Sequence, residues 1–355
     1  MSRSLQRSLN SMARLAMRAS AKAMKQALRS SKKAGLLKTI KTKATPKRSV
    51  AAKPRMRKPA SNAPSHSRAL QWTTGVAIGA SGARRYRLYT PSGVRRDERL
   101  PLVVMLHGCT QNAQALAVST KMNRLAQAER FFVLYPEQER LANLQNCWNW
   151  YDTRTGHAQR EADSIAATVD HICLTQPVDR QRIALAGLSA GAGMAALLAV
   201  RHSERFQSVV MHSGIAPGVA NSTASALSAM RGHRAAVPLA PSTTGQQLPA
   251  LLVIQGSADV TVAPGNATQA VQLWAQHESA LANQPRTVQR GKRYPATVTD
   301  YRHRGRLVAT LCLIQGLGHA WSGGAPGLPY SDPEGPDASR MAWAFIQKQF
   351  RISGP

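Results

Sequence analysis

Apolar positions after about residue 70 recur with the periods of strands and helices. The clearest strand is the continuous apolar run Leu102–Leu106, which leads directly into His107-Gly108. An uninterrupted apolar run of this length is typical of a strand that is buried on both faces of a sheet. Further strands are predicted at 71–78, 84–89, 131–135, 182–186, 206–212 and 250–255, with a strand pair at 301–303 and 307–315.

Helical patterns separate these strands. Helices are predicted at about 115–129, 163–174, 190–201, 267–282 and 337–350. Strands that alternate with helices predict an α/β fold with a mainly parallel sheet and helices on both of its faces. The Ala-, Ser-, Thr- and Pro-rich segment 221–247 interrupts this alternation, and we expect it to form a cap or excursion.

Charge divides the chain into two parts. Residues 1–69 contain 19 of the 47 Lys and Arg residues and no Asp or Glu, whereas the remainder carries 28 Lys and Arg against 17 acids. The first acidic residue is Asp97. We therefore predict a basic tail and linker over 1–69 and one domain, large enough to be a catalytic domain, over 70–355.

The basic tail has two interpretations. Leu5, Leu9, Met12 and Ala16 recur at helical spacing, so the segment could be a basic amphipathic helix that binds an anionic surface, a polymer granule or a nucleic acid. The simpler alternative is a solvated, disordered extension, because charge runs without acids rarely fold alone. The simpler alternative is favoured.

Targeting signals and metal motifs are missing from the sequence pattern. No stretch approaches the roughly 18 apolar residues of a membrane span, and the N-terminus contains no apolar core of about 7–15 residues like that of an export signal. The four cysteines form no CxxC or Cys/His cluster, so no metal or other cofactor is expected.

The candidate nucleophile is Ser189, in the sequence Gly187-Leu188-Ser189-Ala190-Gly191. The serine lies between a predicted strand and a predicted helix, where a G-x-S-x-G turn exposes the hydroxyl and leaves no room for larger flanking residues. The alternative is an ordinary tight turn at the start of a small-residue helix. The strand–turn–helix context favours the nucleophile.

A serine hydroxyl needs a base, and the base needs an orienting acid, in the chain order Ser, acid, His. Asp259 follows the strand at 250–255 and is the candidate acid. Its alternative is a loop-capping aspartate. Asp300 is the main rival, but it falls within a predicted strand rather than after one.

The candidate base is His319, in a glycine-rich loop after the last predicted strand. Its alternative is a plain loop histidine. His202 and His212, on a predicted helix and strand, are expected to be structural, and His303 lies in a basic hairpin between two arginines.

An ester-cleaving serine also needs donors for the oxyanion of its transition state. The expected donors are the backbone amides of Ala190, the residue after the nucleophile, and Cys109, in the loop His107–Asn112. This loop departs from the His-Gly-Gly-Gly pattern of many hydrolases, so the second donor is less strongly specified than the first.

Six motifs in one order resemble the poly(3-hydroxybutyrate) depolymerase family of esterases, which includes feruloyl and acetyl-xylan esterase relatives. The resemblance covers about residues 70–350 and implies an α/β-hydrolase fold. The motifs are Leu106-His107-Gly108-Cys109-Thr110-Gln111, Tyr135-Pro136-Glu137-Gln138, Cys147-Trp148-Asn149-Trp150-Tyr151, Gly187–Gly191, Gly256–Asp259 and Gly318-His319-Ala320-Trp321.

The resemblance adds expectations to the analysis of the residues. It implies the same triad, Ser189, Asp259 and His319, and it implies that the segments of Cys109 and Cys147 adjoin and are bridged by a disulfide. Two buried thiols are the alternative. An extracellular location is also implied by the family, against the absence of an export core, so the location stays open.

Three of the six tryptophans belong to these motifs: Trp148, Trp150 and Trp321. They could form an aromatic surface that binds an aliphatic polyester or an aromatic acyl group. Ordinary core packing is the equal alternative.

The sequence therefore predicts a serine esterase that acts through an acyl-enzyme on short 3-hydroxybutyrate oligomers or polyester. A feruloyl or acetyl-xylan esterase is the alternative substrate class. A surface- or granule-binding protein that works through residues 1–69 is the alternative of a different class.

Overall fold

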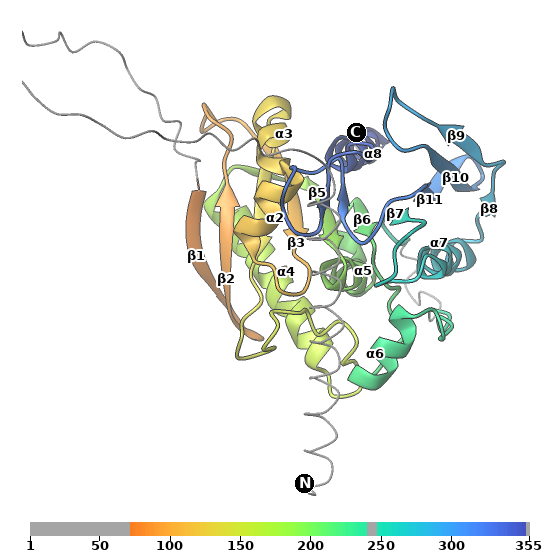
Figure 1. Cartoon of the computed structure of the whole chain (residues 1–355). Helices are drawn as coiled ribbons and strands as arrows, with labels where there is room; N and C mark the ends of the chain where they lie inside the picture. Colours follow the sequence, from red (N-terminus) through yellow and green to blue (C-terminus); the bar gives the residue numbers. More distant parts are fainter. Residues whose placement is uncertain (1–71, 240–246, 353–355) are drawn as a thin grey trace, which may run out of the picture. The chain divides into compact units, whose positions relative to one another are not determined.

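The computed structural model describes residues 72–239 and 247–352. The predictions for the basic tail at 1–69, and for the part of the excursion at 240–246, lie outside the described residues. The rest of the chain forms one large sheet flanked by helices (Figure 1).

The sheet has the strand order β1-β2-β4-β3-β5-β6-β7-β11-β10-β8, and β9 also pairs with β10. Pairing is parallel from β4 through β3, β5, β6 and β7 to β11, and antiparallel at both edges. The strands are β1 Trp72–Gly79, β2 Gly82–Tyr89, β3 Leu100–Leu106, β4 Phe132–Pro136, β5 Val178–Leu188, β6 Ser208–His212, β7 Ala250–Gly256, β8 Leu281–Ala282, β9 Arg286–Val288, β10 Ala296–His303 and β11 Arg306–Ile314.

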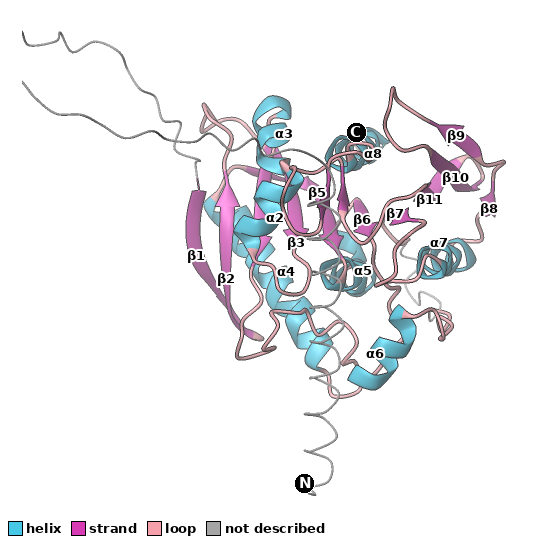
Figure 2. Ribbon diagram, viewed as in Figure 1, coloured by secondary structure: helices cyan, strands magenta, loops and turns pink. Residues whose placement is uncertain are grey.

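Helices cover both faces of this sheet (Figure 2). They are α2 Ala113–Thr120, α3 Met122–Glu129, α4 His157–Thr175, α5 Ala190–Arg201, α6 Thr223–Met230, α7 Gly265–His277 and α8 Ala338–Ile352. Two very short strands, β12 Trp321–Ser322 and β13 Ser331–Asp332, pair with each other outside the main sheet. The predicted α/β-hydrolase fold is confirmed.

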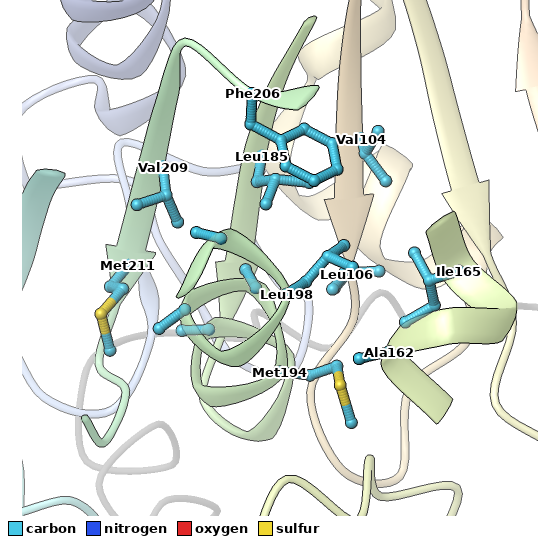
Figure 3. Packing of buried hydrophobic residues seen from close by; sticks show 14 of the residues in the cluster. Val104, Leu106, Ala162, Ile165, Leu185, Met194, Leu198, Phe206, Val209 and Met211 are labelled. Carbon is cyan, nitrogen blue, oxygen red and sulfur yellow. The ribbon is translucent and has the colours of Figure 1, made fainter. Parts of the chain in front are cut away.

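The core consists of two apolar layers, one on each face. Along β3, Leu102, Val104 and Leu106 belong to the layer that contains α4, α5 and α7, whereas Val103 and Met105 belong to the layer of α2, α3 and α8. Figure 3 shows part of the first layer, where Met194 and Leu198 of α5 pack between the strands and α4. This alternation explains why the strand is apolar at every position: side chains of a strand point to opposite faces, and both faces are covered.

Most predicted elements are found within a few residues of their expected bounds, and α5 has the predicted bounds 190–201. The predicted helix at 115–129 is instead two helices that meet at Lys121, whose φ is 56°. The Thr120 hydroxyl donates to the Leu116 carbonyl at 2.8 Å and accepts from the Met122 amide at 3.3 Å. These side-chain bonds compete with the helical ladder and end the first helix there.

Two other helix bounds differ. Helix α4 begins at His157, several residues before the predicted start. The predicted helix at 267–282 ends at His277, and Leu281–Ala282 becomes the edge strand β8, which pairs with β10. The excursion contains the helix α6, whose Ser222 and Ser225 form a reciprocal capping box.

Candidate active site

Ser189 lies on the turn that joins β5 to α5. Its backbone has φ 55° and ψ −120°, a conformation that residues with side chains rarely adopt. The Ser189 amide donates to the His212 carbonyl at 2.9 Å, and the Gly193 amide donates to the Ser189 carbonyl at 3.1 Å. The serine is therefore held on a strained turn at the carboxyl end of a central strand, the setting of a nucleophile elbow.

The two glycines of the turn are required by contacts between backbones. A Cβ on Gly187 would overlap the carbonyl group of Gly191, and a Cβ on Gly191 would overlap the carbonyl oxygen of Leu106 at the end of β3. The turn consequently packs against the neighbouring strand with no space for a side chain at either position.

Asp259 lies in the turn after β7 and is buried. Its Oδ1 accepts hydrogen bonds from the amides of Thr261 and Val262, at 2.9 and 2.8 Å. Its Oδ2 accepts from Nε2 of Gln255 at 3.0 Å and is 2.8 Å from Nδ1 of His319. Four donors therefore converge on one carboxylate.

These donors determine the charge state of Asp259. Burial alone would raise the pKa of its carboxyl, but the hydrogen bond and charge of His319 and the two backbone amides outweigh burial. The net pKa is below the usual range of an aspartate, because each donor stabilises the ionised form. The carboxylate is thus charged in the folded protein near neutral pH.

His319 is carried by the loop that follows β11. This loop passes directly over the turn of Asp259, since a Cβ on Gly256 would overlap the carbonyl oxygen of Leu317. The Ala258 amide also donates to the Leu317 carbonyl at 3.0 Å. Because Nδ1 of His319 faces Asp259, Nε2 is the nitrogen left for chemistry. Asp300, the rival acid, instead lies within β10 and bonds to Thr310 and Arg286.

The loop after β3 carries the expected second oxyanion donor. Three of its amides are engaged: Gly108 donates to Oε1 of Gln111 at 3.0 Å, Thr110 donates to the Gln145 carbonyl at 2.7 Å, and Gln111 donates to the Gly108 carbonyl at 3.3 Å. Within the described residues, the Cys109 amide has no acceptor in the structure. The amide assigned from sequence is therefore available to a ligand.

Cys109 and Cys147 form a disulfide, with their Cα atoms 4.2 Å apart. This is the pair that the family resemblance implies, whereas Cys173 and Cys312 are free thiols. The bridge and the bond from Thr110 to Gln145 join the loop after β3 to the segment that precedes α4. The position of the Cys109 amide therefore depends on both segments.

The buried carboxylate of Glu161, on α4, stabilises the position of these two segments through hydrogen bonds. It accepts hydrogen bonds from Nε2 of Gln138 at 2.6 Å and from the amide and side chain of Asn149 at 2.9 and 2.7 Å. Gln138 in turn donates from its amide to Nε2 of His107 at 3.2 Å. Burial lowers the pKa of His107 to about 4, so its ring is neutral and Nδ1 donates to the Gly108 carbonyl.

The three motif tryptophans do not form an aromatic surface. Trp148 and Trp321 are fully buried and Trp150 is 7% exposed. Trp321 stacks on His212 with ring centroids 5.0 Å apart and donates to the Ser339 hydroxyl, and Trp150 packs beside Gly193. The prediction that they bind substrate through an exposed surface is therefore wrong, and core packing beneath the site is what they do.

Sequence reasoning missed three residues that shape the site. Gln255, at the end of β7, is fully buried and donates to Asp259. Tyr330 has φ 55°, its ring lies edge-on 6.2 Å from His319, and its hydroxyl is 3.4 Å from that of Thr110. Glu161 is the third. A glutamine four residues before the candidate acid was the only sequence signal that could have pointed to Gln255.

His212 is structural, as its place on a predicted strand suggested. It is fully buried, and its Nε2 accepts from the Ser322 amide at 3.2 Å while Nδ1 lies 3.1 Å from the Ser213 hydroxyl. Burial, followed by the nearby His319, lowers the pKa of its ring to about 3. The neutral ring links the strand beside the serine to the loop that carries His319.

The described residues contain no group of three or more His, Cys, Asp or Glu side chains that could hold a metal ion. Among the same residues, no helix has the length and apolar character needed to cross a membrane.

Comparison with known proteins extends this description. The family model described as Esterase PHB depolymerase matches residues 84–282, which is more than half of the chain. The chain belongs to this family. The match contains Ser189 and Asp259 and ends before the loop of His319.

Two relatives share sequence similarity with most of the chain. It is 29% identical over 270 residues to poly(3-hydroxyalkanoate) depolymerase C of Paucimonas lemoignei, covering 73% of this chain and 62% of that protein. It is 26% identical over 239 residues to acetylxylan esterase A of Talaromyces purpureogenus, covering 61% of each. The chain thus spans less than two thirds of the length of either relative.

One similar solved structure is the acetyl xylan esterase from Aspergillus awamori. It superimposes with a TM-score of 0.61 at 18% identity, covering 78% of this chain and 99% of that one. At this identity the similarity supports the fold alone.

The buried neutral ring of His212 makes stability dependent on pH. Its pKa is about 3 in the folded protein against about 6.5 when unfolded, so the unfolded state binds more protons below pH 6.5. We expect the free energy of unfolding to fall as the pH drops from 6.5 to 4.5. His212→Gln should reduce this fall by on the order of 2 kcal/mol.

Urea titrations at pH 7.5, 6.5, 5.5 and 4.5 measure the effect. At pH 7.5 the ring is neutral in the folded and the unfolded state, so it adds nothing to the pH dependence there. If the free energy of unfolding falls equally in both proteins between pH 6.5 and 4.5, the assignment of a neutral buried ring is contradicted.

Proposed function

We propose that the protein is a carboxylic ester hydrolase in which Ser189 is the nucleophile, His319 the general base and Asp259 the residue that orients the base. The observation that carries this proposal is the 2.8 Å pair between Nδ1 of His319 and Asp259. It is formed by two loops at the same carboxyl edge of the sheet as the strained serine turn. Membership of the esterase family supports the same chemistry.

In the proposed first half-reaction, Oγ of Ser189 attacks the ester carbonyl carbon and its proton passes to Nε2 of His319. The carbonyl oxygen becomes an oxyanion, which accepts hydrogen bonds from the amides of Cys109 and Ala190. The C–O bond to the alcohol then breaks, and the alcohol leaves with the proton from His319. An acyl-enzyme remains on Ser189.

In the second half-reaction, His319 takes a proton from water as the water attacks the acyl carbon. Collapse of the second tetrahedral intermediate returns the proton to Ser189 and releases the carboxylic acid. Asp259 holds the imidazole in one tautomer and stabilises its positive charge in both halves. It can do so because its pKa is below the usual aspartate range.

We infer that the acyl group belongs to short 3-hydroxyalkanoate oligomers or polyester. The depolymerase name of the Paucimonas lemoignei relative supports this class, and the acetylxylan esterase relative supports the alternative of a small acyl group on a sugar. Since Trp148 and Trp321 are buried, they offer no face to an aromatic acyl group.

Ser189→Ala should lower kcat for p-nitrophenyl butyrate by at least about 1,000-fold, because it removes the nucleophile while the oxyanion donors remain. Ser228→Ala, a change on α6, is the matched control and should keep wild-type activity. Circular dichroism checks that both variants are folded. Comparable activity in Ser189→Ala and wild type would reject the assignment of the nucleophile.

Gln255→Met should change the pH profile of kcat/KM, and not only the stability of the folded protein. It removes one donor from the Asp259 oxygen that faces His319, so the ionised form of Asp259 is less stabilised and the pKa of its carboxyl should rise. We expect the acidic limb of kcat/KM to move to higher pH by about 0.5–1 unit, with KM little changed.

The control for Gln255→Met is Gln269→Met on α7, where the side chain bonds to the Ala236 amide away from the site. It should leave the pH profile unchanged. A lower kcat in Gln255→Met with an unmoved acidic limb would assign Gln255 to packing alone.

Substrate class is tested by kcat/KM for the 3-hydroxybutyrate trimer, p-nitrophenyl acetate and methyl ferulate. The trimer should be cleaved with the highest kcat/KM, and methyl ferulate with the lowest, because the buried tryptophans cannot stack on a feruloyl ring. A preference for methyl ferulate would overturn the proposed acyl specificity while leaving the serine mechanism intact.

A further inference from the structure

A cleft of about 860 Å³ lies at the opposite edge of the sheet from Ser189. Its walls are the segment between β2 and β3 and the segment that runs from the end of α4 into β5. The cleft adjoins the amino end of β5, and Ser189 follows its carboxyl end. A strand of eleven residues extends by about 3.3 Å per residue, so the two places are roughly 30 Å apart.

Four arginines are among the residues that line this cleft. Arg95, Arg96 and Arg99 come from one wall and Arg180 from the other, and Asp179 is the only acidic residue that lines it. The buried ring of Phe132 lies beneath. The proposed reaction uses none of these groups.

The carboxylates near the cleft are already paired. Asp97 binds Arg95, with its Oδ1 3.0 Å from Nε of that arginine. Glu98 binds Arg130 through two hydrogen bonds, at 3.1 and 2.6 Å. Asp97 and Glu98 therefore each form an ion pair with one arginine.

Asp179 is occupied in the same way. One oxygen accepts from Nε of Arg182 at 2.6 Å, and the other accepts from the Gln181 amide at 2.9 Å. Among the residues that the structure describes, Arg96, Arg99 and Arg180 therefore have no carboxylate partner. Three guanidinium groups without a carboxylate partner thus line one cleft, although that of Arg99 donates to the backbone carbonyls of Arg96 and Glu98 at 3.3 and 3.4 Å.

The two walls are fixed to each other. The Leu100 amide donates to the Pro177 carbonyl at 3.0 Å, and Arg182 donates to the Arg99 carbonyl at 2.9 Å. The guanidinium groups on the two walls consequently project from joined segments rather than from independent loops. The backbone of the two walls is therefore fixed before a ligand binds, and only the exposed arginine side chains have to be ordered.

We propose that this cleft binds a phosphate-bearing anion with more than one phosphoryl group. A guanidinium binds phosphate oxygens through two parallel hydrogen bonds, and arginine is the side chain best suited to that geometry. Charges on two opposite walls match an anion that extends across the cleft. The site is separate from the ester site and does not depend on the proposed hydrolysis.

The test is a calorimetric titration of the full chain with pyrophosphate, tripolyphosphate and ATP at two salt concentrations. Wild type should bind tripolyphosphate or ATP saturably at one site per chain. Tighter binding of ATP would identify a nucleoside phosphate, and tighter binding of tripolyphosphate an inorganic oligophosphate; either supports the proposal.

The decisive variant is Arg96→Gln with Arg180→Gln, which removes one arginine from each wall and should weaken binding at least 10-fold. The matched control is Arg231→Gln with Arg304→Gln, two exposed arginines that do not line the cleft. Both variants retain the 19 Lys and Arg residues of segment 1–69, so their difference reports the cleft.

Equal affinity in the two double variants, or no saturable binding in wild type, would overturn the proposal. Activity toward p-nitrophenyl butyrate should be the same in both variants and unaffected by the anion. Because binding is measured without an ester, failure of the anion site and failure of the proposed hydrolase activity are distinguishable.

Discussion

The site depends on a close approach of backbones at the carboxyl edge of the sheet. The turn after β5 presses against the end of β3 so tightly that Gly191 has the Leu106 carbonyl where a Cβ would be. The same kind of contact recurs at the end of β7, where the loop of His319 crosses the turn of Asp259 at Gly256. Both approaches require glycine, and both bring chemistry-bearing loops close together without side chains between them.

Hydrogen-bond donors, rather than burial alone, decide which buried groups at this edge are charged. His107 and His212 are buried and neutral, each with one nitrogen donating and the other accepting. Asp259 is buried but charged, because four donors replace the water it loses. The surroundings of this carboxylate are thus complete before any substrate arrives, which is the condition for electrostatic preorganisation.

Much of this arrangement was predictable from the sequence. The alternation of apolar strands with helices predicted the sheet, and the strand–serine–helix pattern located the turn of Ser189, because these signals are local. The break at Lys121 was not predicted, since it depends on the hydroxyl of Thr120 bonding to the backbone. Glu161 and Tyr330 were missed because their contacts, to Gln138 and to Thr110, join segments that are distant in the sequence. Gln255 was missed although Asp259 is only four residues away, because a glutamine at the end of a strand is not by itself a signal of a site.

The tryptophans illustrate the opposite error. Their rarity and their place in the motifs suggested a binding surface, but a large apolar ring gains more from burial than from exposure. Sequence alone does not say on which side of a loop a ring lies, so the two interpretations had to stay open until the structure placed Trp148 and Trp321 inside.

Helix α5 has a consequence for how the protein tolerates change. Nine of its twelve residues are buried, and eight of those nine are Gly, Ala or Leu. A Cβ on Gly193 would meet the ring of Trp150 at 3.1 Å, and a Cβ on Gly214 would run into the side chain of Ala192. A saturation-mutagenesis map of the chain would therefore show a strongly restricted stretch along a helix whose side chains contribute no group to the proposed reaction.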